Sequence, residues 1–250
     1  MSVVLGGCSV YRTYKRPDVA VIDSLYRQQI SPADSVASIA DLSWKELFTD
    51  PHLQKLIETG LCNNSDLGIA RLRAEEAEAL LQSARLSYLP SISLSPQGTI
   101  GKVEHSKTTK SYDLATSASW EIDIFGKLTN TKREARVVLE QSEAYRQAVQ
   151  TQLIATIANS YYTLLMLDEQ LNISRRTARN WSENLRVMKA LKNAGQTTDM
   201  AVAQTEASKL SVDASLLSLE RQITELENTL LSLLGSVPGD ITRSTLSSQS

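Results

Sequence analysis

Three acidic residues stand close together in the sequence and are the first candidates for chemistry. Asp113, Glu121 and Asp123 occupy odd positions of the segment 112–124. Paired carboxylates can act as general acid and base when their environments separate their pKa values. In an extended strand, however, these side chains share one face with Ser117. A solvated lining is therefore the simpler interpretation, and we predict no catalytic role for them.

The histidines and motif content give no enzyme class. His52 and His105 are far apart in sequence, and neither has a Cys or a second His at metal-ligand spacing. The chain contains no G-x-S-x-G, P-loop or dinucleotide-binding motif. We therefore predict that the chain is not an enzyme and needs no cofactor or metal.

The two cysteines predict different environments. Cys8 follows Leu5-Gly6-Gly7, a string similar to a lipobox, the peptidase site that leaves an acylated N-terminal cysteine. Residues 1–8 are expected to be a truncated signal, since the basic and apolar leader is missing. The string by itself leaves lipidation of Cys8 open. Cys62 is expected to be a small buried thiol.

Composition and charge exclude several classes of protein. Hydrophobic residues make up 42% of the chain, which is enough apolar material for an ordered structure. The formal net charge of -2 does not match the basic footprint of a nucleic-acid binder. No stretch approaches the roughly 18 consecutive apolar residues of a transmembrane helix. A membrane contact would therefore require strands or an attached lipid.

The N-terminal third reads as an arm followed by helices. Residues 9–60 are expected to form an extended arm and a short helix over 43–59, which Pro51 interrupts or restarts. Residues 61–90 contain a second helix over 66–88, because strong helix formers fill its interior and Pro90 follows it.

Residues 91–125 predict a β-hairpin, because the period of the pattern changes to two. The even positions of 112–124 are mostly apolar and the odd positions are small, polar or acidic. A strand of about a dozen residues matches a tilted membrane-crossing strand. The pattern predicts lipid-facing Leu114, Trp120, Ile122 and Ile124 and channel-lining Asp113, Ser117, Glu121 and Asp123. A lone two-stranded sheet is marginal in water, so it must find partners in other chains or in a missing part of this one.

Residues 126–235 predict a long antiparallel helical hairpin. Residues 127–194 contain neither Gly nor Pro, and about 67 helical residues would extend roughly 100 Å. Two adjacent stripes of apolar and small residues indicate neighbours on both sides, as in a wall. The turn between the helices is Ala194, Gly195, Gln196, Thr197, Thr198 and Asp199. The Ser/Thr-rich residues 236–250 are expected to be a flexible tail.

Six strings in this order resemble the outer-membrane efflux protein family, the TolC-like exit ducts. They are Trp44-Lys45-Glu46-Leu47-Phe48-Thr49-Asp50, Asn63-Asn64-Ser65-Asp66-Leu67, Ala84-Arg85 before Pro90, Trp120-Glu121-Ile122-Asp123-Ile124-Phe125-Gly126-Lys127, Gly195 with Asp199, and Leu233-Leu234-Gly235. The similarity is closest to the lipoprotein branch that serves resistance-nodulation-division pumps. In this context we expect Cys8 to carry a lipid.

The resemblance implies a passive export duct of a tripartite efflux pump. Members of this family have two repeats, and their homotrimers join a transmembrane β-barrel to a helical tube in the periplasm. This chain is expected to supply one repeat, with two barrel strands and part of the α-barrel wall, and to lack the second. The implied partners are a periplasmic adaptor at the turn 194–199, an inner-membrane pump and outer-membrane lipid, with no nucleic acid.

Two other functions remain open from the sequence. A periplasmic adaptor also contains a long helical hairpin, but it flanks that hairpin with lipoyl-like β segments rich in Gly and Val. Here the flanks are Phe125-Gly126 and a Ser/Thr tail. A soluble coiled-coil scaffold would leave the amphipathic strand pair without a role.

Overall fold

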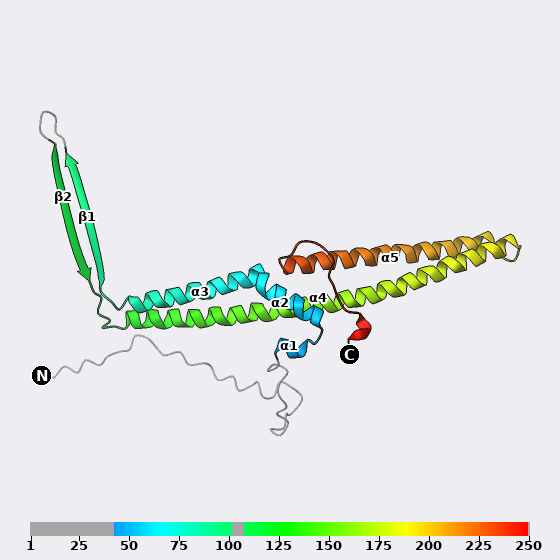
Figure 1. The fold of residues 1–250 in the computed structure, drawn as a ribbon, viewed down its shortest axis with the longest axis horizontal. Coiled ribbons are helices and arrows are strands. Elements are labelled where there is room, and N and C mark those ends of the chain that lie inside the picture. The colour runs from blue at the N-terminus through cyan, green and yellow to red at the C-terminus, as the bar shows by residue number, and fades with distance from the viewer. Residues whose placement is uncertain (1–42, 102–107, 250) are drawn as a thin grey trace, which may run out of the picture. The chain divides into compact units, whose positions relative to one another are not determined.

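The computed structural model describes residues 43–101 and 108–249, and Cys8 and His105 lie outside them. Figure 1 shows mainly helix with one antiparallel pair of strands, as the sequence predicts. The elements are α1 (Trp44–Leu47), α2 (Pro51–Asn63), α3 (Ser65–Leu86), β1 (Ser91–Gly101), β2 (Thr109–Ser119), α4 (Lys127–Asn193), α5 (Asp199–Leu233) and the 3-10 turn η3 (Leu246–Ser248).

Side-chain caps set the early helix boundaries. Pro51 starts α2 as its first residue, where a missing backbone N–H has no cost, and the Asp50 carboxylate accepts a hydrogen bond from the His52 N–H at 2.8 Å. Asn64 separates α2 from α3, and its side-chain oxygen accepts from the Leu67 N–H at 2.9 Å. The predicted restart at Pro51 is therefore confirmed.

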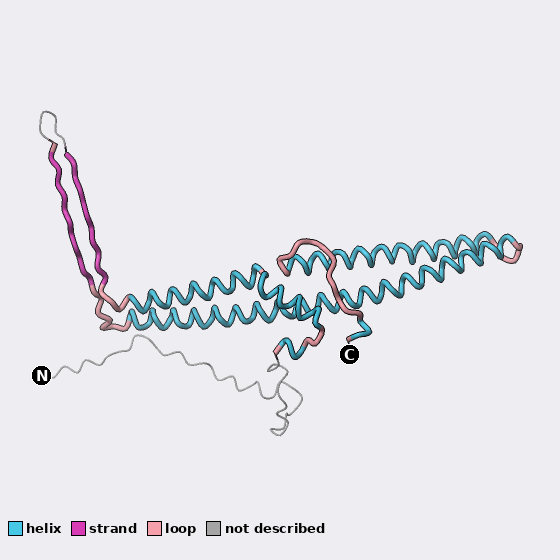
Figure 2. Tube along the Cα trace, viewed as in Figure 1, coloured by secondary structure: helices cyan, strands magenta, loops and turns pink. Residues whose placement is uncertain are grey.

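α4 is the element along which the other helices lie. α3 packs on its first half and α5 on its second half, both antiparallel to it (Figure 2). At one end of α3, the Tyr88 hydroxyl lies 3.1 Å from the Thr129 hydroxyl of α4. At the other end, the Asn64 amide donates to the Leu233 carbonyl at 3.0 Å. The start of α3 therefore meets the end of α5 beside the middle of α4.

The hydrophobic core lies where these helices meet. α4 contributes side chains over residues 153–171, including the fully buried Tyr161. α2 brings Leu53 and Ile57, and Leu67 comes from α3. α5 brings Leu230, and Leu234 directly follows α5. Away from this junction the two-helix ribbon leaves apolar side chains exposed, among them Leu72, Leu80, Val137, Leu210 and Leu217.

The expected burial of Cys62 is wrong. Cys62 is an exposed free cysteine, because the buried face of α2 follows Leu53, Ile57 and Gly60 and Cys62 falls outside it. The expected flexibility of residues 236–250 stays a prediction, although Ile241 is buried in the core and η3 contacts α4. Composition alone does not reveal the polar anchors that hold this segment.

Two helical glycines predict opposite responses to alanine. A Cβ at Gly60 would lie 2.6 Å from the Ile157 Cδ1 and 3.1 Å from the Leu234 Cδ2, whereas a Cβ at Gly68 meets nothing within 4 Å. Gly60→Ala should destabilise the fold by about 1–3 kcal/mol through overpacking. Gly68→Ala should stabilise it by about 0.5–1 kcal/mol through helix propensity. Thermal unfolding should show a lower Tm for the first and a higher Tm for the second; equal shifts would contradict this packing.

Candidate functional site

The β-hairpin has one apolar and one polar face, and its register confirms which residues share them. Leu94 pairs with Thr116 and Ser93 with Ser117, and opposed residues of an antiparallel pair lie on the same face. The first face holds Ile92, Leu94, Pro96, Gly98, Ile100, Lys110, Tyr112, Leu114, Thr116 and Ala118. The second holds Ser91, Ser93, Ser95, Gln97, Thr99, Ser111, Asp113, Ala115, Ser117 and Ser119.

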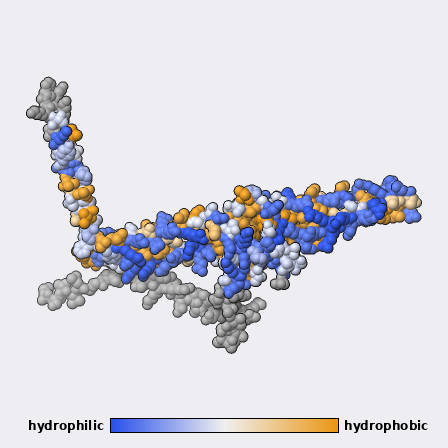
Figure 3. Space-filling view, in the orientation of Figure 1, coloured by the Kyte–Doolittle hydropathy of each residue, from blue (hydrophilic) through white to orange (hydrophobic). Residues whose placement is uncertain are grey.

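The apolar face has no cover within the described part of the chain. Tyr112 is 76% exposed and Leu114 is 71% exposed, although residues of this type are ordinarily buried. On the polar face, hydroxyl pairs connect the strands: Ser91 to Ser119 at 2.8 Å and Ser93 to Ser117 at 2.7 Å. Figure 3 shows hydrophobic residues, in orange, on the surface of this hairpin.

The second strand ends earlier than its alternation predicts. β2 ends at Ser119, so Trp120, Ile122 and Ile124 lie in the connection to α4 with their side chains exposed. Of the eight predicted face residues, Asp113, Leu114 and Ser117 are in the strand. The strand prediction over residues 120–124 is wrong because capping of α4 begins there.

The carboxylates of Asp123 and Glu121 form hydrogen bonds and an ion pair with residues at the start of α4. The Asp123 carboxylate accepts from the Leu128 and Thr129 N–H groups, each at 2.9 Å, and from the Thr129 hydroxyl at 2.6 Å. The Thr129 hydroxyl is the largest cause of a lowered Asp123 pKa, and these backbone donors add to it. Glu121 pairs with Lys127 at 2.8 Å. Any channel-lining role of Glu121 and Asp123 remains a prediction.

The turn between α4 and α5 is built as the sequence predicts. Gly195 has a φ of 71°, and the Gln196 N–H donates to the Leu191 carbonyl at 2.9 Å, which closes the C-terminal end of α4. Thr198 caps α5 by accepting from the Ala201 N–H at 3.3 Å. Lys192 and Asp199 form an ion pair across the turn. Nothing lies within 4 Å of the position that a Cβ would take at Gly195, so this position faces open space.

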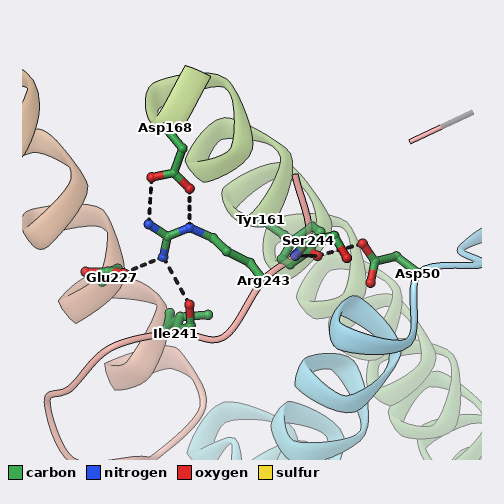
Figure 4. Close-up of polar contacts among 7 residues, drawn as sticks. All are labelled: Asp50, Tyr161, Asp168, Glu227, Ile241, Arg243 and Ser244. Atoms are coloured by element: carbon green, nitrogen blue, oxygen red, sulfur yellow. Dashed lines mark hydrogen bonds and ion pairs between the residues drawn. The ribbon is translucent and has the colours of Figure 1, made fainter. Parts of the chain in front are cut away.

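A buried polar network, which the sequence analysis missed, fastens the segment after α5 (Figure 4). The Tyr161 hydroxyl donates to Asp50 at 2.6 Å and accepts from the Ser244 N–H at 3.1 Å. Gln249 also donates to Asp50, at 2.7 Å. Burial acts to raise the Asp50 pKa, but these side-chain donors and the His52 N–H together lower it to about 2. Asp50 is therefore a charged acceptor at neutral pH.

Arg243 is the second anchor of this segment. Its guanidinium makes a two-pronged contact with Asp168, at 2.5 and 2.8 Å, and also pairs with Glu227 of α5. The hydrogen bonds to Asp168 are the largest cause of a raised Arg243 pKa, against which burial acts. The sequence offered a weak signal for Asp50, because an Asp directly before Pro51 is suited to cap a helix that begins at that proline. It offered none for pairing Arg243 with residues far away in the chain.

The described chain presents two exposed ends, the β-hairpin and the turn between α4 and α5. The described residues hold no group of His, Cys, Asp or Glu side chains arranged to bind a metal ion. Within residues 43–101 and 108–249, none of the helices is both long and apolar enough to cross a membrane. An uncovered two-faced hairpin joined to a long helical hairpin matches the single structural repeat of the protein class that the sequence resemblance implies.

Comparison with known proteins agrees with that class. Residues 56–236 match the sequence profile described as "Outer membrane efflux protein". The chain belongs to the outer membrane efflux protein family. It is 32% identical over 238 residues to the "Probable outer membrane lipoprotein SilC" of Salmonella typhimurium, covering 93% of this chain and 51% of that protein. It is 27% identical over 251 residues to the "Probable efflux pump outer membrane protein TtgC" of Pseudomonas putida, covering 96% and 52%.

A solved structure supports the same fold. The chain is similar to CusC, whose structure is described as showing conformational changes accompanying folding and transmembrane channel formation, with a TM-score of 0.77 and 25% identity. That match covers 96% of this chain and 54% of CusC. The chain thus spans about half the length of the curated relatives it matches. The profile match confirms the resemblance to this family that the sequence analysis drew from the six strings.

Removal of the Arg243 side chain should release the segment after α5. Arg243→Ala leaves Asp168 and Glu227 without their shared partner, which should cost about 3 kcal/mol, or roughly a hundredfold faster exchange of the Ser244 amide hydrogen. The control is Arg175→Ala, which removes a surface pair with Glu220 and should change stability by at most about 1 kcal/mol. Hydrogen-exchange mass spectrometry measures both; unchanged protection in Arg243→Ala would contradict the anchoring role.

Proposed function

We propose that this chain forms part of the wall of a passive outer-membrane export duct in a tripartite efflux pump. The observation that carries the proposal is the hairpin with an apolar and a hydroxyl-rich face, both uncovered. A membrane β-barrel needs this alternation, with apolar side chains toward lipid and polar ones toward the lumen. Family membership and the printed descriptions of SilC and TtgC support the same conclusion.

The hairpin requires strands from elsewhere to work in a membrane. β1 and β2 pair with each other, so each has an outer edge with backbone groups available for pairing. In lipid an unpaired edge is prohibitively costly, so a spanning sheet must close on itself. Neighbouring copies in a homotrimer, together with the second repeat that members of this family have, would supply such strands, and the apolar side chains exposed on α3, α4 and α5 would then pack between neighbouring helices. Homotrimerisation is therefore part of the proposal.

Thiol labelling of the hairpin tests the membrane placement. Single cysteines should replace Leu114 or Ser117, in a background carrying Cys62→Ser because Cys62 is an exposed free thiol. A water-soluble reagent applied to the protein in its membrane should modify the cysteine at 117 and not the one at 114. Leu114→Arg should cost about 2–4 kcal/mol if the site lies near mid-membrane. The matched control, Ser117→Arg, should cost far less. Efficient labelling at 114 in assembled protein would sink the proposal.

The turn 194–199 is proposed to be the docking tip for a periplasmic adaptor. α4 runs without interruption from Lys127, next to the hairpin, to Asn193, so the turn lies at the other end of a helix about 100 Å long. Gly195 and the small Thr197 permit close backbone approach, whereas Gln196 differs from the more apolar residue common there in the resembling family. The inner-membrane pump, of the resistance-nodulation-division type, would act through that adaptor.

A bulky side chain at Gly195 should separate docking from assembly. Gly195→Trp should abolish efflux because the indole blocks backbone approach, while membrane insertion and oligomer formation persist. The control, Gly195→Asn, places a small residue that tolerates the left-handed backbone and should retain most efflux. Efflux assays and adaptor cross-linking in cells measure the outcome. Full efflux and cross-linking by Gly195→Trp at normal expression would show that the tip does not dock.

Cys8 is proposed to carry a lipid anchor at the outer membrane. Its Leu5-Gly6-Gly7-Cys8 string supports this, as does the similarity to SilC, which is described as an outer membrane lipoprotein. Mass spectrometry of the native N-terminal peptide checks the assignment, and an unmodified peptide continuing upstream through Cys8 would refute it.

A further inference from the structure

A pocket lined by four cationic side chains lies where α3 ends and α4 begins. It has a volume of about 580 Å³. Its lining residues are Arg85, Tyr88, Thr129, Lys132, Arg133 and Arg136. The four lining residues on α4 are Thr129, Lys132, Arg133 and Arg136, whose spacing of i, i+3, i+4 and i+7 places them on one face of the helix. Arg85 and Tyr88 approach from the end of α3. We call this the basic pocket.

The four cations of the basic pocket have no ion-pair partner among the described residues, and no acidic side chain lines the pocket. Among the lining residues, the nearby Asp123 carboxylate contacts only the neutral Thr129. Further along α4 the pattern differs, since Arg175 pairs with Glu220 and Arg186 with Glu183. Like charges three or four positions apart destabilise a helix. An anion in the basic pocket would relieve that repulsion.

Two amphipathic aromatic residues, Trp120 and Tyr88, lie at the basic pocket or in contact with its lining residues. The Trp120 indole, directly after β2, donates to the Tyr88 carbonyl at 3.1 Å. The Tyr88 hydroxyl lies 3.1 Å from the Thr129 hydroxyl, and the Lys132 ammonium lies 5.7 Å from the centre of the Tyr88 ring. Trp and Tyr concentrate at membrane–water interfaces, where basic side chains attract anionic headgroups. The region where the hairpin joins α3 and α4 therefore has the residue composition typical of a membrane–water interface.

Exposed apolar residues that are close in sequence to the lining residues favour an amphiphile over a free anion. Leu86 and Leu89 flank Tyr88 in the chain, and Phe125 lies just before α4; all three are exposed. A soluble phosphate would make no use of such a surface. A phospholipid would place its phosphate among the cations and its acyl chains along the leucines and the apolar face of the hairpin.

We propose that the basic pocket binds the headgroup phosphate of an anionic phospholipid in the periplasmic leaflet. Arginine forks suit the geometry of phosphate oxygens, and three of the four cations are arginines. The volume falls within the range of about 300–1,000 Å³ typical of small-molecule sites. This inference rests on the proposed function, because a membrane-spanning hairpin sets the depth at which the basic pocket meets lipid.

Native mass spectrometry of the detergent-purified protein tests this site. Titration with phosphatidylglycerol should give tighter binding than titration with zwitterionic phosphatidylcholine. The double variant Arg133→Gln/Arg136→Gln should bind phosphatidylglycerol roughly 25-fold more weakly, since each cation near a lipid surface contributes a factor of about five. The control double variant, Arg146→Gln/Arg179→Gln, removes equal charge from α4 outside the basic pocket and should bind normally.

Three results would overturn the site. Equal binding of the two lipids would remove its anion preference, and equal weakening in both double variants would make the effect one of net charge. Displacement of phosphatidylglycerol by equimolar inorganic phosphate would identify a free-anion site instead. Hairpin labelling tests the proposed function separately. A correctly labelled hairpin with no phosphatidylglycerol preference would thus reject the basic pocket alone.

Discussion

Burial of the middle of α4 holds the described chain together, because α2, α3 and α5 all pack side chains against residues 153–171 of α4. Each fully buried aliphatic or aromatic side chain there contributes about 1.5–3 kcal/mol relative to exposure. Tyr161 adds a polar function to this burial, since its hydroxyl lies between Asp50 and the Ser244 N–H. The core therefore holds the start of α3 and the end of α5 against the middle of α4, and both antiparallel ribbons extend from this junction.

The two ribbons are thinner than the junction and bury much less. Two helices side by side can bury one stripe of each, so the remaining apolar side chains, such as Leu80, Val137 and Leu217, stay exposed. The hairpin extends this trend to its limit, because two strands have no third layer to cover either face. A chain with this distribution of apolar surface has a stable centre and extremities suited to assembly.

Patterns within one element were predictable from the sequence, whereas contacts between distant segments were not. The absence of Gly and Pro over 127–194 predicts α4, and Gly195 with Thr198 predicts its end and the start of α5. Alternation predicts both faces of the hairpin but extends β2 too far, because Asp123 satisfies the first N–H groups of α4 instead of continuing the strand. The docking of Arg243 onto Asp168 and Glu227 depends on tertiary approach, for which a single sequence holds no periodic signal. For the basic pocket, the helical spacing of its α4 residues was present in the sequence, but the approach of Arg85 and Tyr88 from the end of α3 was not.

Electrostatics act differently at the junction and toward the tip. The Arg243 side chain is 13% exposed and that of Glu227 is 11% exposed, so water screens their attraction weakly and loss of one partner leaves a buried charge. The pairs Lys189–Glu206 and Lys192–Asp199 are largely exposed, and such pairs contribute about 0–1 kcal/mol. The register of α5 on α4 is thus determined by the core and Arg243 rather than by surface ion pairs. The core and Arg243 do not extend to the tip. There the left-handed Gly195 and the Thr198 cap define the backbone geometry of the turn between α4 and α5.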